Sequence, residues 1–120
     1  MKTVRAFPAD PVSVSAARRF VLGVLPAGTE EFRQAAELMV SELATNAVRH
    51  VRSDFAVSVE ARGRTIRVEV TDHGGGTPTM RCPGPTEPSG RGLRIVDMFA
   101  ADWGVEQLPA GGKTVWFTLT

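Results

Sequence analysis

The chain has 120 residues and a mass of 12.9 kDa, enough for one hydrophobic core and too little for two. Hydrophobic residues make up 42% of it and charged residues 22%, which excludes a disordered or fibrous protein. Its formal net charge is only +1, so no overall field draws it to nucleic acid or to an anionic membrane. We expect a single domain over residues 1–120 whose function depends on a local site.

The sequence also bears on cellular location and metal chemistry. No apolar segment approaches the roughly 20 residues of a membrane-spanning helix, and the first residues lack the apolar stretch of a signal peptide. The single cysteine, Cys82, excludes an internal disulfide and a multi-cysteine zinc site. We therefore expect a cytoplasmic protein that binds neither a membrane nor nucleic acid directly, and a metal held, if at all, by oxygen ligands.

The first half of the chain predicts a strand and two helices. Residues 3–7 form a weak strand pattern, and Asp10-Pro11 begins a helix whose apolar positions recur at helical spacing over residues 11–25. Thr29 can cap a second helix, which is expected to be the longest element. The apolar stripe of this second helix consists of Phe32, Ala36, Met39, Leu43 and Ala47.

The next segments predict a hairpin, a loop and a third helix. Apolar and polar residues alternate over residues 55–61 and again over residues 66–70, with a turn at Arg62-Gly63 between them. Residues 77–89 contain four prolines and are predicted to form a loop. Apolar positions at helical spacing then predict a short helix over residues 93–100.

The last segments predict a second hairpin and complete the expected fold. Residues 103–108 and 113–119 have strand patterns, and residues 109–112 form the turn between them. Because the strands are grouped in hairpins, the order of elements predicts an α+β fold. We expect a two-layer sandwich with helices on one face of a mixed β-sheet.

Three polar residues of the second helix form the first motif that can carry chemistry. Glu42, Asn46 and His50 are spaced four apart, which puts them on one side of the helix along the border of the apolar stripe. His50 is nearest the centre of that stripe, and Glu42 should be partly covered. Alone, such a row is more often a solvated flank than a site.

Two further motifs are rich in glycine. Asp72 ends a predicted strand and is followed by three glycines, including Gly74 and Gly76. Glycines let a ligand approach the backbone, and a carboxylate at a strand end can accept a hydrogen bond from an amino group. Residues 90–95 read GRGLRI and begin the third helix, whose free N–H groups favour an anion such as phosphate. Each of these motifs alone is common.

Together, E-x-x-x-N on a helix, D-x-G-x-G after a strand and G-x-G-L-x-I after a proline-rich loop resemble the GHKL ATPases. This Bergerat-fold family includes gyrase-type topoisomerases and histidine kinases. The resemblance covers nearly the whole chain and is closest to the small bacterial anti-sigma factor serine/threonine kinases, whose helix motif is similar to residues 41–50. It implies a homodimer that binds ATP and Mg²⁺, sequesters a sigma factor and phosphorylates a STAS-class anti-sigma antagonist.

The resemblance also implies roles for individual residues. Glu42 would be the general base for the attacking hydroxyl, and Asn46 would ligate the Mg²⁺ that bridges the phosphates. Asp72 would read the adenine amino group, with Gly74 and Gly76 against the base and sugar. The other nucleotide-binding positions that it implies are His50, Gly90, Arg91, Gly92, Leu93 and Thr114.

Some of these roles have alternatives. The loop over residues 77–89 would be the ATP lid, from which Arg81 could contact the terminal phosphate, although a solvated loop arginine is the simpler interpretation. Gly90 and Gly92 would present amides to the phosphates. For His50, a core-facing histidine bonded to the backbone is as good an interpretation as a position near the phosphates.

The last strand departs from the family's pattern. The family often reads G-T-x-V there, with the threonine assisting adenine recognition through water, whereas Lys113 occupies that position here and Thr114 follows it. Lys113 and the short loop motivate an alternative function, a non-catalytic ATP-binding regulatory module that controls a protein partner. The catalytic part of a two-component histidine kinase is a weaker alternative, because no helical segment supplies the phosphorylated histidine.

Overall fold

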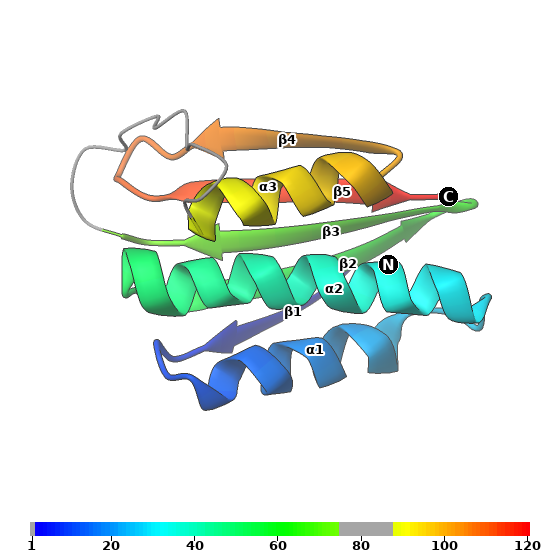
Figure 1. The fold of residues 1–120 in the computed structure, drawn as a ribbon, viewed down its shortest axis with the longest axis horizontal. Coiled ribbons are helices and arrows are strands. Elements are labelled where there is room, and N and C mark those ends of the chain that lie inside the picture. Colours follow the sequence, from blue (N-terminus) through cyan, green and yellow to red (C-terminus); the bar gives the residue numbers. More distant parts are fainter. Residues whose placement is uncertain (1, 75–87) are drawn as a thin grey trace.

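A computed structural model shows a five-stranded sheet with three α-helices on one face (Figure 1). It describes residues 2–74 and 88–120. The elements in chain order are β1 (Lys2–Phe7), α1 (Val12–Val24), α2 (Glu30–Asn46), η1 (Ala47–Val51), β2 (Phe55–Arg62), β3 (Thr65–Asp72), α3 (Pro88–Phe99), β4 (Asp102–Gln107) and β5 (Lys113–Leu119). None of the helices in these described ranges is long and apolar enough to cross a bilayer.

The α+β architecture is confirmed, but the expectation of a mixed sheet was wrong. The strand order is β1-β2-β3-β5-β4, and each of the pairings between these neighbours is antiparallel. β3 and β4 run in the same direction and are joined through α3, the connection typical of parallel neighbours. β5 lies between them, however, and pairs with both, so β3 and β4 do not pair with each other.

The first two helices begin where the capping residues predict. The Asp10 carboxylate accepts the N–H of Val12 at 3.0 Å, and the Thr29 hydroxyl accepts the N–H of Phe32 at 3.1 Å. Each bond satisfies an amide that has no partner within its helix. α2 is the longest helix of the described residues, as predicted. Its buried side chains are Ala36, Met39, Val40, Leu43 and Ala44.

The core lies between α2 and the sheet face that the helices cover. Met39 of α2, Phe55 of β2 and Phe117 of β5 are among the largest side chains that are wholly buried there. Phe7 of β1 stacks on Phe55 with ring centroids 5.4 Å apart. These aromatic and aliphatic groups stabilise the position of α2 over the central strands, which determines where its polar residues lie relative to the strand ends.

The other face of the sheet is polar and carries an ordered network. The Arg67 guanidinium lies 4.2 Å from the centre of the Trp116 ring, and its Nε donates to the Glu69 carboxylate at 2.9 Å. Burial alone would raise the pKa of Glu69, but the hydrogen bond from Arg67, the charge of Lys2 and the hydrogen bond from Ser58 together lower it below its usual value. This network joins β1, β2, β3 and β5.

Two of the boundaries that differ from the predictions lie beside the predicted site motifs. α2 ends at Asn46, and the chain continues as the π-helical turn η1. The spacing of apolar residues in the sequence continues past Asn46 and did not reveal this change. η1 ends at Val51, and the next residue, Arg52, has a left-handed φ of 57° and donates its N–H to the Ala47 carbonyl. α3 begins at Pro88, inside the predicted loop, because proline is well suited to the first turn of a helix.

Candidate functional site

Glu42 and Asn46 lie one turn apart near the end of α2, and both residues are half-buried, as predicted for Glu42. The Asn46 Oδ1 atom is itself buried and has no hydrogen-bond partner in the described part of the chain. Leaving such an oxygen unsatisfied costs about 1–3 kcal/mol, so buried polar atoms of this kind usually have a partner. A cation or a donor group of a bound ligand would satisfy it.

Asp72 is the last residue of β3, and only 5% of it is exposed. Its two carboxylate oxygens have different partners. Oδ1 accepts the N–H of Gly74 at 3.2 Å, and Oδ2 accepts a hydrogen bond from the Lys113 ammonium at 2.7 Å. Because a buried carboxylate without a partner is costly, these two bonds stabilise the Asp72 side chain at the end of the strand.

The end of β3 packs directly against the end of the α2 and η1 segment (Figure 1). A Cβ added at Gly74 would overlap a methyl group of Val51, so any larger residue there requires Val51 to shift. The N–H of His73 donates to the Ser53 hydroxyl at 2.9 Å, which ties the same two segments together. The fold therefore brings the helix motif and the strand motif to one edge, although they are far apart in the sequence.

Lys113 reaches Asp72 because β3 and β5 are paired in one register. The Cα atoms of Asp72 and Lys113 are directly opposite, so both side chains lie on the same face of the sheet. The preceding Gly112 has a φ of +87°, and a Cβ there would lie 2.2 Å from the Asp72 carbonyl oxygen. Glycine thus lets the turn before β5 come close enough to β3 for the ion pair to form.

Thr114 does not join this site. It is paired with Thr71, the neighbour of Asp72, and successive side chains of a strand point to opposite faces. Its hydroxyl lies 2.8 Å from the Thr71 hydroxyl, on the polar face that the helices leave open. We therefore leave Thr114 out of the nucleotide site that the resemblance implied.

His50 is exposed, so its expected position near the centre of the apolar stripe was wrong. The prediction assumed α-helical geometry beyond Asn46, where the wider turn of η1 changes the direction in which each side chain points. The structure thus places Glu42 and Asn46 on α2, whereas His50 lies in η1 and is exposed. π-Helical turns occur often at functional sites, which is consistent with the position of η1 beside Gly74.

The third motif lies only in part within the described structure. Gly90 is in the first turn of α3 and Gly92 in the second, so only Gly90 is among the amides that a helix leaves without partners. The side chains of Arg91 and Leu93 lie outside the described part. Gly76 and residues 77–87, which include Arg81 and Cys82, are also outside it.

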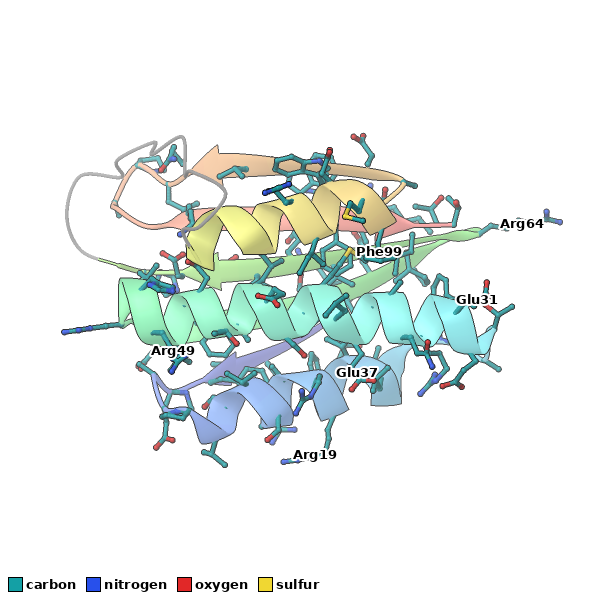
Figure 2. The ribbon with its side chains drawn as sticks, in the orientation of Figure 1. Arg19, Glu31, Glu37, Arg49, Arg64 and Phe99 are labelled. Carbon is teal, nitrogen blue, oxygen red and sulfur yellow. The ribbon has the colours of Figure 1, made fainter. Side chains whose placement is uncertain are left out.

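The site is at one end of the molecule. Figure 2 labels Arg64, which extends from the turn between β2 and β3 at the opposite end, and Glu31, near the start of α2 and also far from Asn46. Sequence reasoning noted Lys113 only as a departure from a pattern and did not predict its bond to Asp72. To predict this bond, one would have to know that β3 pairs with β5. The paired residues are about 40 positions apart, and no short motif shows such a pairing.

Comparison with known proteins identifies what this arrangement is. The chain matches the family model described as the histidine kinase-like ATPase domain over residues 7–119, which covers the ends of α2, β3 and β5 that form the site. No curated protein matches the chain. The predicted resemblance to the GHKL ATPases is confirmed. With a matched span of that length, the chain belongs to the histidine kinase-like ATPase domain family and is an ATP-binding module of the GHKL type.

Proposed function

We propose that this protein is an ATP-dependent serine/threonine kinase of the anti-sigma type. It phosphorylates a serine of a STAS-class antagonist, sequesters a sigma factor, and acts as a cytoplasmic homodimer. The observation that carries the kinase proposal is the buried Oδ1 of Asn46, one turn from Glu42, which has no hydrogen-bond partner among the described residues. The similarity of residues 41–50 to the helix motif of the anti-sigma kinases supports the choice of substrate class.

The residues present fit the Mg²⁺ that accompanies ATP. Mg²⁺ prefers hard oxygen ligands and takes most of them from water and substrate phosphates, so a single protein oxygen can be sufficient. Oδ1 of Asn46 is such an oxygen, and it has no partner in the described structure. When bound, the ion neutralises charge on the phosphates. Asn46 is therefore the residue that would hold it.

Glu42 performs the proton transfer in this proposal. Its carboxylate accepts the proton of the substrate serine hydroxyl while the hydroxyl oxygen bonds to the terminal phosphorus of ATP. The bond from that phosphorus to the bridging oxygen breaks at the same time, and ADP leaves. General-base assistance of this kind contributes roughly 10²–10⁴-fold to a rate. Asp72, at the end of β3, accepts a hydrogen bond from the adenine amino group and so orients the nucleotide.

The test is phosphotransfer by Glu42→Gln to STAS-domain proteins of the same organism. The amide cannot accept the proton, so we expect unchanged binding of Mg-ATP and transfer reduced at least about 10²-fold. Glu37→Gln is the matched control because it makes the same change on the same helix, on the side toward α1 (Figure 2). Its transfer rate should equal that of the wild type.

Two results would contradict this proposal in different ways. Full transfer activity in Glu42→Gln would remove Glu42 from the role of base. If the wild-type protein instead bound a partner only with ATP and never yielded a phosphorylated product, the non-catalytic regulatory module would be the better description. Phosphate analysis of the partner by mass spectrometry distinguishes the two outcomes.

A further inference from the structure

We propose that Lys113 reads the adenine base directly, by donating a hydrogen bond to the N1 atom while Asp72 accepts one from the neighbouring amino group. This makes Lys113 a specificity-determining residue of the nucleotide site, and it rests on the proposed role of Asp72 in ATP binding. The carrying observation is the 2.7 Å bond between the Lys113 ammonium and Oδ2 of Asp72.

The ammonium has donors to spare. A lysine ammonium carries three N–H groups, and within the described residues that of Lys113 is bonded to Asp72 alone. The Lys113 side chain is 25% exposed, whereas that of Asp72 is 7% exposed. Lys113 is therefore the more exposed partner of the pair.

The carboxylate also has acceptor capacity left. Its two oxygens offer about four lone-pair sites. Oδ1 uses one for the N–H of Gly74 and Oδ2 uses one for Lys113. Adenine can therefore bind Asp72 without breaking the ion pair. Because Lys113 and Gly74 each hold one oxygen, the carboxylate is fixed in orientation before the nucleotide arrives, which reduces the entropy lost on binding.

Asp72 and Lys113 present an acceptor and a donor side by side, which complements the amino group and the N1 atom on one edge of adenine. Adenine presents an amino donor beside the N1 acceptor, and the site presents the Asp72 acceptor beside the Lys113 donor. Thr114, which follows Lys113 in β5, lies on the opposite face of the sheet and cannot contact the same ligand edge. Direct reading by Lys113 thus takes the place of the threonine-based recognition that the family resemblance implied.

A nucleotide analogue tests this inference without changing the protein. In 1-deaza-ATP a C–H group replaces N1, while the amino group, sugar and phosphates are intact. We expect the wild-type protein to bind the analogue about 10-fold to 100-fold more weakly than ATP in calorimetric titration, the loss of one hydrogen bond to a charged group. Equal affinity for the two nucleotides would overturn the inference.

The Lys113→Met variant completes the comparison. It removes the donor but retains much of the side-chain length, so ATP and 1-deaza-ATP should bind it equally. Lys2→Met is the matched control because Lys2 also pairs with a carboxylate, Glu69, on the far face of the sheet. It should keep the wild-type preference for ATP. A Lys113→Met protein that still prefers ATP by the wild-type factor would show that another group reads N1.

A variant that does not fold, and a protein that does not bind ATP, can each be distinguished from a protein in which Lys113 does not read N1. Because Lys113→Met leaves Asp72 without its cation, Lys113→Gln serves as a second variant that keeps a neutral donor and should retain part of the preference for ATP. If neither variant folds, the wild-type comparison of the two nucleotides still decides. A folded wild-type protein that binds neither nucleotide would overturn the proposed function together with this inference, whereas equal binding of both overturns only the inference.

Discussion

The buried oxygens of Asn46 and Asp72 differ in how the fold treats them. Both carboxylate oxygens of Asp72 have partners within the described structure, whereas Oδ1 of Asn46 has none. Asp72, the acceptor proposed to read the base, is thus held in position in advance, and the proposed metal ligand is left for an incoming ion. At Asn46, but not at Asp72, ligand binding would remove the energetic cost of a buried oxygen that has no partner in the described structure.

Gly74 provides a prediction at this same scale. We expect Gly74→Ala to lower the free energy of unfolding by about 1–3 kcal/mol, because the added methyl group meets Val51 and a packed contact cannot absorb it without movement. Denaturant titration measures the change. Gly74→Ala combined with Val51→Ala should regain part of the loss from the single substitution.

A matched control is available on α1. Nothing lies within 4 Å of the Cβ position of Gly23, which is inside the helix, so Gly23→Ala should stabilise the protein by about 0.5–1 kcal/mol. If Gly74→Ala were as stable as the wild type, the turn after β3 would not be packed on η1 as described.

Among the elements, β3 contributes to both faces of the sheet in different ways. Asp72 lies on the face that the helices cover, and Glu69 lies on the open face in the network of Arg67 and Trp116. The alternation of side chains along one strand therefore separates the candidate site from a network that contributes to stability. This separation lets the two be tested by different substitutions.

The Glu69 network predicts a dependence of stability on pH. The pKa of Glu69 is lowered in the folded protein, so its ionised form contributes stability that is fully present above the unfolded pKa, about 4.5. That contribution is lost as the pH falls through the lower, folded pKa. We expect Glu69→Gln to be less stable than the wild type at pH 7.

Acid titration of stability checks this sign. The difference in the free energy of unfolding between wild type and Glu69→Gln should shrink as the pH falls below about 4.5, measured by denaturant titration at a series of pH values. A difference that stayed constant down to acidic pH would mean that the charge of Glu69 contributes nothing and that the substitution acts through packing alone.

For the whole molecule, the site joins segments that are distant in the chain. α2 and η1 supply Asn46 and the contact with Gly74, whereas Asp72 and Lys113 come from β3 and β5. Any ligand that bridges these segments stabilises the folded state over the unfolded chain, in which they are apart. The stability of the whole domain is therefore a measure of ligand binding.

Asn46→Ala tests this link. Without ligand it should be at least as stable as the wild type, because it removes a buried oxygen that has no partner within residues 2–74 and 88–120 and introduces a better helix former. At Mg-ATP concentrations about 100 times the wild-type dissociation constant, the wild type should gain about 2.7 kcal/mol and the variant much less. Unfolding with ATP and a chelator is the control. A full gain in the variant would exclude Asn46 as the metal ligand.

The sequence by itself determined most of the elements and the family. Apolar periodicity and local caps such as Thr29 depend on neighbouring residues, so they predicted the helices and hairpins, and the three motifs indicated an ATP-binding GHKL domain. Only the tertiary structure decided which residues meet. The bond from Lys113 to Asp72 and the position of Thr114 on the other face of the sheet both follow from the register in which β5 pairs with β3. That register is selected by packing across the whole sheet, which a local pattern does not contain.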